Sequence, residues 1–496
     1  MRRLLSDARL RLGACVLAMA AAAGLGVVTH AKEPVTRAEG GDQPTRTVVN
    51  RTALSCPAIA GGGKLSSVVN AVSPTLPEGT PTAAGKEAPL TISPLPETSD
   101  PTGSLLARGK IASTAPVTKP APLMIHGVGP LAAGTVGTST TTSTEGVNRG
   151  MASTPCQLPG SDFWFVGASG ASDRRDVLVL TNLDSINAEV NVTVYARSGP
   201  QDLPNARGIV VPARGTTELY LNLVARNLRD IALHVRSTGG RVAPSLRDNA
   251  TTGSEPAGVD FLNPSAPPAK KVFVPAAAPG GGLRILSVAN PSDLQATASL
   301  TVHGPNGPFK PAGLETVQIA AGSVKTVRLD PVLHGDPSAI TVSADQPVTA
   351  SMRMVDASGT DFASIGAAEV LTGPAYLVLP AHNQPAVLQV TAPGKTGSVK
   401  FELRDAAGRV LDTRALDVIA GATSQIAFKA QPRPTYLMVE QTRGTVVAGV
   451  TLMPAAKPDQ DEDDDEVAQV AAWPLNTSLV FRAQLGAQPE VRSALR

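Results

Sequence analysis

A pattern of short apolar runs separated by turn residues recurs three times along this chain, and it constrains the fold more than any other feature. The clearest copy runs from Phe163 to Asp248 and contains FWFVGAS, DVLVLTN, VNVTVYARSGP and IALHVRSTGG. Short β-branched and aromatic runs bounded by Gly, Pro, Asn and Asp are typical of antiparallel β-sandwiches. Alternation turns Val190, Val192 and Val194 toward one face. The pattern therefore predicts an all-β fold.

The three copies lie roughly 100 residues apart, which is the length of one sandwich domain. FWFVG is matched by VFVPA and AYLVLPA, and the equivalent valines of a later strand are Val235, Val342 and Val439. The third copy differs because Ala392-Pro393 replaces an Asn-centred turn. We predict tandem β-sandwiches over residues 161–264, 265–372 and 373–455.

The N-terminus has the features of an export signal. Four arginines at positions 2, 3, 9 and 11 precede an apolar run from Leu12 to Val28, and small residues follow as far as Ala31. That run is close to the minimum length that can span a bilayer. A cleaved signal peptide and a retained membrane anchor over 1–31 therefore both remain open, and either implies export.

The segments between and after these regions are predicted from their composition. Residues 32–46 form a polar linker, and residues 47–160 an irregular N-terminal β-region in which short strands alternate with Thr-, Ser-, Gly- and Pro-rich chain. The acidic run DQDEDDDE lies in a linker over 456–466. The tail, 467–496, contains LVFRAQL, which predicts one last strand.

Export makes the cysteines informative. Cys15 lies in the signal, which leaves Cys56 and Cys156. Two cysteines in an oxidising compartment usually pair, so we predict a disulfide that fastens the N-terminal region to the first of the three sandwiches. Two buried free thiols are the alternative.

The motifs of common catalytic and metal sites are absent from the sequence. No two of the six histidines lie three to five positions apart, which excludes an HExxH site. Gly167-Ala168-Ser169-Gly170 lacks the spacing of a nucleophile elbow, and Pro279-Gly280-Gly281-Gly282 precedes a strand pattern instead of a helix. We predict no catalytic, cofactor-binding or metal-binding residues and no enzymatic activity.

Charged residues suggest solvated clusters. Asp173 and Asp176 flank Arg174-Arg175 in a predicted loop, whereas Asp230 and Asp248 could meet only by accident of the fold. The acidic run from Asp459 to Glu466 could gather Ca²⁺ weakly, but it lacks the glycine and the spaced glutamate of an EF-hand, so a solvated linker is preferred. A net charge of +2 without a basic, aromatic-rich patch argues against nucleic-acid binding.

Trp164 is the one candidate ligand-binding residue. Phe163 and Phe165 alternate with it, so one set of rings faces outward unless it is covered. Packing in a core or between domains is the preferred interpretation, and a stacking platform for sugar rings is the alternative.

The motifs FWFVG, LVLTN, VNVTVYARSGP, RGIVVPARG and LHVRSTGGRV, with the cysteine contexts SCP and STPC, resemble an actinobacterial family of exported proteins of unassigned function. The repeats, such as the unit NPSD…VTASMRM, are also similar to tandem Ig-like modules of bacterial surface proteins. These resemblances imply a β-rich fold and an envelope or extracellular location. They imply no ligand and no catalytic residue.

Two functions follow as expectations. The first is a non-enzymatic cell-envelope scaffold whose partners are envelope proteins. The second is a binding module for cell-wall or capsular polysaccharide. A row of exposed Trp and Tyr would favour glycan, and free sheet edges or apolar patches would favour protein.

Overall fold

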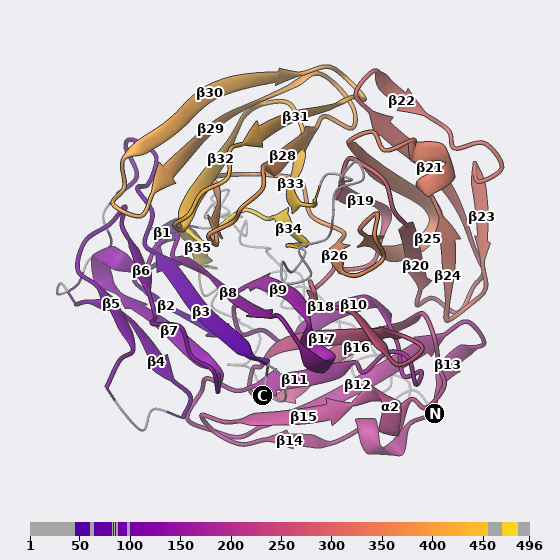
Figure 1. Ribbon diagram of the computed structural model, residues 1–496, viewed down its shortest axis with the longest axis horizontal. Coiled ribbons are helices and arrows are strands. Elements are labelled where there is room, and N and C mark those ends of the chain that lie inside the picture. The colour runs from indigo at the N-terminus through magenta and orange to yellow at the C-terminus, as the bar shows by residue number, and fades with distance from the viewer. Residues whose placement is uncertain are drawn as a thin grey trace, which may run out of the picture. The chain divides into compact units, whose positions relative to one another are not determined.

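The computed structural model describes residues 45–59, 64–81, 83, 85, 88–96, 100–454 and 469–484, and these residues form an all-β structure (Figure 1). The predicted signal or anchor over 1–31 and the acidic linker over 456–466 lie outside the described residues. Within the described residues, no helix is long and apolar enough to span a membrane.

The chain divides into two compact units. The larger is Val48–Arg482, and the smaller consists of the residues before and after it. Strand β1 (Thr45–Val48) pairs with β35 (Phe481–Gln484), where the sequence predicted a last strand. All other features described below belong to the larger unit.

Four β-sandwiches with one shared strand order make up the larger unit. Counted from the start of each sandwich, one sheet has the order 1-6-3-4 and the other has the order 5-2-7-8. The first sandwich consists of β2 (Arg51–Cys56), β3 (Leu65–Val72), β4 (Leu90–Pro94), β5 (Gly103–Leu105), β6 (Ile111–Ser113), β7 (Leu123–Val128), β8 (Val136–Ser143) and β9 (Gly150–Pro155).

The second and third sandwiches repeat this order with small additions. The second consists of β10 (Asp162–Ala168), β11 (Val177–Thr181), β12 (Ala188–Ala196), β13 (Gly199–Gln201), β14 (Ile209–Val211), β15 (Thr216–Tyr220), β16 (Ile231–Gly239), β17 (Ala243–Thr252) and β18 (Glu255–Leu262). The third consists of β19 (Ala269–Ala277), β20 (Arg284–Asn290), β21 (Ala296–Gly304), β22 (Gly307–Phe309), β23 (Thr316–Ile319), β24 (Ser323–Arg328), β25 (Ser338–Val355) and β26 (Phe362–Gly366). The long strand β25 serves in both sheets of the third sandwich.

The fourth sandwich ends later in the chain than expected. It consists of β27 (Ala375–Leu379), β28 (Ala386–Thr391), β29 (Gly397–Asp405), β30 (Val410–Val418), β31 (Thr423–Phe428), β32 (Thr435–Arg443), β33 (Val447–Leu452) and β34 (Ala471–Leu475). The last strand, β34, follows the acidic segment and places the fully buried Trp473 in the core. The predicted end at residue 455 therefore leaves out one strand.

The prediction of three sandwiches after an irregular region undercounts the repeats, because residues 47–160 contain the first sandwich. Its strands are short, and β8 reads VGTSTTTS, a composition typical of a linker. In the structure most of these residues are buried and their hydroxyl groups paired: Thr141 Oγ1 donates to Ser67 Oγ at 2.9 Å, and Ser139 Oγ donates to the Pro57 carbonyl at 2.7 Å. Satisfied hydroxyl groups can occupy a buried strand at little cost.

A disulfide joins Cys56 and Cys156, with 4.4 Å between their Cα atoms. Cys56 ends β2 and Cys156 directly follows β9, so the bond links the two sheets of the first sandwich. The expectation that it fastens this region to the next sandwich is wrong. Both sulfurs instead belong to the apolar core of the first sandwich.

We expect that replacing both cysteines with serine lowers the free energy of unfolding by about 2–5 kcal/mol, because the bond closes a long loop in the unfolded chain. Denaturant titration of the double variant and of the reduced native chain checks this, and the two should agree. Peptide mapping that finds both cysteines alkylated without prior reduction would contradict the disulfide.

Candidate functional site

One amide side chain connects the last strands of all four sandwiches. Asn263 directly follows β18, and its Nδ2 donates to the carbonyls of Ser364 on β26 at 2.9 Å and of Ala472 on β34 at 3.0 Å. Its Oδ1 accepts a hydrogen bond of 3.3 Å from Thr154 Oγ1 on β9. We call the surroundings of this side chain, where β9, β18, β26 and β34 meet, the central junction.

Asp361, directly before β26, makes a second three-way contact in the central junction. Its carboxylate accepts backbone N–H groups of Phe362 at 2.9 Å, of Met151 on β9 at 3.1 Å and of Val259 on β18 at 3.3 Å. Gly150 and Gly258 leave room for it, since a Cβ at either position would lie within 3 Å of Asp361 Oδ1. Three sandwiches are therefore held by one carboxyl group.

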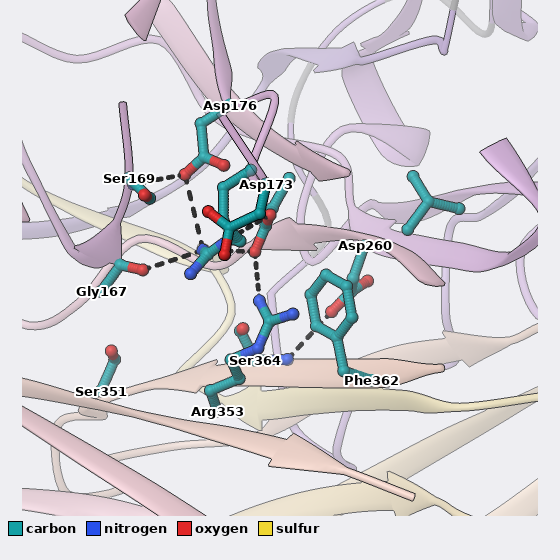
Figure 2. A network of polar contacts seen from close by, with 12 residues as sticks. Gly167, Ser169, Asp173, Asp176, Asp260, Ser351, Arg353, Phe362 and Ser364 are labelled. Carbon is teal, nitrogen blue, oxygen red and sulfur yellow. Dashed lines mark hydrogen bonds and ion pairs between the residues drawn. The ribbon is translucent and has the colours of Figure 1, made fainter. Parts of the chain in front are cut away.

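Asp260 on β18 makes a further contact, with β26. Its Oδ2 accepts the Ser364 N–H at 2.9 Å, while Oδ1 is buried without a hydrogen-bond partner (Figure 2). Asp260 and Asp361 thus cross between the last strands of the second and third sandwiches in opposite directions.

A buried ion cluster extends the central junction between the second and third sandwiches. Asp248 on β17 accepts hydrogen bonds from Arg174 Nε at 2.7 Å, from Arg174 Nη2, and from Arg353 Nη1 on β25. The Arg353 guanidinium carbon also lies 3.3 Å from the centre of the Phe362 ring, a cation–π contact (Figure 2). Ser351 on the same strand donates to the Val166 carbonyl.

Asp176 is the fourth member of the ion cluster. Its Oδ2 accepts the Ser169 N–H at 2.7 Å and lies 3.6 Å from Arg174 Nη2, and its Oδ1 is buried without a partner. Two aspartates and two arginines are therefore enclosed together, which is the arrangement that makes the loss of any single member costly.

The pKa values of the carboxyl groups in the central junction and the ion cluster are shifted in opposite directions. Burial and the neighbouring Asp248 raise the pKa of Asp176 well above its usual value. Burial likewise raises the pKa of Asp260 and of Asp361. Burial also acts on Asp248, but Arg174 and Arg353 outweigh it and lower the pKa of Asp248. The two arginines thus favour the charged form of Asp248, whereas burial disfavours the charged form of the other three carboxyl groups.

The structure corrects the interpretation of these charges as a solvated loop cluster. Asp176 is buried in the ion cluster, and the side chain of Arg174 is mostly enclosed there. Arg175 is exposed, and Asp173 reaches the surface, where it accepts a hydrogen bond from Arg229 at 2.7 Å. Asp230 pairs with Arg197 and does not meet Asp248.

Trp164 takes a packing position. It is 5% exposed and stacks on His234 at 4.0 Å and on Tyr195 at 5.7 Å between ring centroids. The adjoining side chains of Val166, Ala289 and Val324 lie between the second and third sandwiches. Trp164 also contributes to the lining of a cavity described below, but with the His234 ring stacked on it and 5% of its surface exposed it offers no open platform for sugars.

None of the sequence motifs described above indicated Asp260, Asn263, Arg353 or Asp361. A signal for two of them was present, because VDFLN and TDFAS both begin a buried stretch with Asp-Phe and lie about one repeat apart. The sequence alone does not indicate that both carboxyl groups cross to a neighbouring sandwich.

A cavity of about 390 Å³ borders the central junction. Strands or loops of all four sandwiches line it, and its polar side chains include Asp162, Gln157, Glu369 and Asn476. Its volume lies within the range of small-ligand sites. Among the residues that the structure describes, no group of three or more His, Cys, Asp or Glu could hold a metal ion.

The model of a family described as "Family of unknown function (DUF5719)" matches residues 111–429, which is well over half of the chain. The chain belongs to this family. DUF5719 thus agrees with the expected membership of a family without an assigned function. No curated protein matches the chain.

Two solved structures show only a distant likeness to this DUF5719 chain. The crystal structure of Thermotoga maritima 1070 is 21% identical over 20% of this chain and 93% of that chain, with a TM-score of 0.18. A Streptomyces avermitilis alpha-L-rhamnosidase complexed with L-rhamnose is 11% identical over 86% of this chain and 57% of that chain, with a TM-score of 0.12. Neither score supports an argument about fold or function.

We expect that Arg353→Ala destabilises the chain by about 3–5 kcal/mol, because it leaves Asp248 buried with one partner fewer and removes the contact with Phe362. Arg328→Ala is the matched control: Arg328 pairs with Asp330 at the surface, so its removal should leave the stability almost unchanged. Denaturant titration measures the stability of both variants. Equal losses would show that the ion cluster contributes no more to stability than a surface ion pair does.

Asp260→Asn should become relatively more stable than the native chain as the pH rises above about 4. The folded chain keeps a proton on Asp260 that the unfolded chain releases, so the native chain loses up to about 1.4 kcal/mol per pH unit until the raised pKa is reached. Buried histidines such as His303, whose pKa is lowered by burial, contribute the opposite slope to both proteins and cancel in the difference.

Denaturant titrations of the native chain and of Asp260→Asn between pH 4 and 8 measure this difference. Asp293→Asn, at an exposed carboxyl group, serves as the surface control. A stability difference between Asp260→Asn and the native chain that stays constant over this range would show that Asp260 is ionised in the folded chain.

Proposed function

We propose that this protein is a non-enzymatic, exported cell-envelope scaffold of tandem Ig-like β-sandwiches that presents fixed surfaces to other envelope proteins. Export is supported by the N-terminal arginines and apolar run, and the tandem arrangement by the strand order that all four sandwiches share. That order differs from the ABED and CFG order of immunoglobulin domains, so the Ig-like assignment rests only on the packing of two antiparallel sheets in each repeat. The proposal covers both a secreted form and a form anchored through the N-terminal segment.

The observation that carries the proposal is the central junction. Asn263 and Asp361 each bind strands of several sandwiches, so rotating one sandwich against another would break several buried hydrogen bonds at once. Flexible linkers would instead leave the domains free to change their mutual orientation. Fixed mutual orientation is what a scaffold requires.

The buried charged residues of the central junction are better suited to holding the sandwiches together than to catalysis. Asp176, Asp248, Asp260 and Asp361 are all buried, and their hydrogen bonds go to neighbouring strands and arginines. A catalytic carboxyl group must reach a substrate within hydrogen-bond distance. These four groups face the protein interior.

Binding of cell-wall or capsular polysaccharide is the second candidate, and the cavity beside the central junction favours it. Asp162 and Glu369 supply carboxylates that could accept hydrogen bonds from sugar hydroxyl groups. The burial of Trp164 removes the stacking platform that would have favoured this candidate more strongly.

A pull-down with the exported chain separates the two candidates. We expect retention by the protein fraction of the cell envelope and none by purified cell-wall glycan. Retention by purified glycan that is lost in Glu369→Gln, and kept in the surface control Glu255→Gln, would favour the polysaccharide module. Retention by neither fraction would contradict both proposals.

A further inference from the structure

The strand β30 forms a free edge of the fourth sandwich. It ends the sheet of order β27-β32-β29-β30 and, among the described strands, pairs only with β29. In Figure 1 it lies at the outer side of its sandwich, with no described strand beyond it. One row of its backbone N–H and C=O groups is therefore unpaired, which is the usual template for the addition of another strand.

The corresponding edge is interrupted in the other three sandwiches. The first has only β5, the second has β13 and β14, and the third has β22 and β23, each of three or four residues. Short edge strands are a common way to prevent pairing with other chains. In the fourth sandwich the edge is a single strand of nine residues.

Exposed apolar and charged side chains lie along β30. Val410 and Leu411 are 47% and 46% exposed, and a bulge opposite Arg404 leaves Leu411 unpaired with β29. Asp412 and Arg414 follow, joined by an exposed ion pair within the strand. The bulge increases the twist of the edge at Leu411, which hinders pairing with most other strands. Along the regular stretch that follows, the order of the charged residues determines which strand can pair with β30.

That charge order is self-complementary. In an antiparallel pair of two β30 strands related by a two-fold axis, Thr413 meets Thr413 of the second copy. Asp412 then lies opposite Arg414 of the second copy, and Arg414 opposite Asp412 of the second copy. Moving the axis by one residue, to Asp412 or to Arg414, would place Asp412 opposite Asp412 or Arg414 opposite Arg414. Opposite charges in direct cross-strand positions stabilise a pair, and like charges destabilise it.

We propose that β30 is a self-association edge, at which two copies of this chain join the sheets of their fourth sandwiches across a two-fold axis at Thr413. Leu411 then packs beside Ala415 of the second copy, which covers part of the exposed apolar surface. The contact is isologous, so it closes at a dimer and does not propagate. This inference goes beyond the scaffold proposal and does not depend on the identity of any envelope partner.

Charge reversal tests the register. Arg414→Asp places two carboxylates opposite each other at two symmetry-related sites, and Asp412→Arg places two guanidinium groups there. Sedimentation of the full chain over a range of concentrations should show self-association weakened roughly tenfold or more in each single variant. The double variant D412R/R414D restores opposite charges and should recover the native association. Thermal unfolding of each variant checks that the fold is intact.

Arg207→Asp is the matched control, because Arg207 also belongs to an exposed ion pair, with Asp202, away from this edge. It should leave the association unchanged. Thr413→Cys should form a disulfide between two copies under oxidising conditions, whereas Thr216→Cys, on the edge strand β15, should not. A native chain that sediments as a monomer throughout, or single reversals that associate as tightly as the native chain, would overturn the proposal.

Discussion

The arrangement of the four sandwiches depends on the hydrogen bonds that cross between their last strands. Asn263 and Asp361 together contact all four of these strands, mostly through backbone groups. In the interior such bonds act in a low dielectric, where a satisfied network strengthens each member and an unsatisfied one is costly. The sandwiches therefore behave as parts of one structure, although each has its own apolar core.

Local pattern predicted the all-β class and much of the turn structure. Asn290, in the turn sequence NPSD, donates its buried amide to the Leu294 carbonyl at 2.7 Å and accepts the Ser292 N–H at 3.1 Å. Asn182 makes the equivalent contact with the Ile186 carbonyl one repeat earlier. Turns of this kind are local, because each amide bonds to residues a few positions away along the chain. The sequence contains what is needed to infer them.

The first sandwich and the central junction were missed for a different reason. The TSTTTS run of β8 resembles a linker by composition, and its strand character depends on hydroxyl partners as distant as the Val378 carbonyl, which Thr138 reaches at 2.7 Å. Arg353 and Asp248 are about a hundred positions apart, and their pairing follows from how two sandwiches pack. Burial and partner identity are tertiary properties, so periodicity alone cannot assign them.

The position of β34 has a consequence for the order in which the molecule can be completed. The Ala472 carbonyl, which Asn263 requires as a partner, lies near the end of the described chain and follows the acidic segment. While the chain emerges, whether from a ribosome or through a membrane, the first three sandwiches can form before this acceptor exists. Until β34 is present, the amide of Asn263 lacks its hydrogen bond to the Ala472 carbonyl, and the core of the fourth sandwich lacks Trp473. Completion of the whole unit is thus tied to the arrival of a few residues close to its C-terminal end.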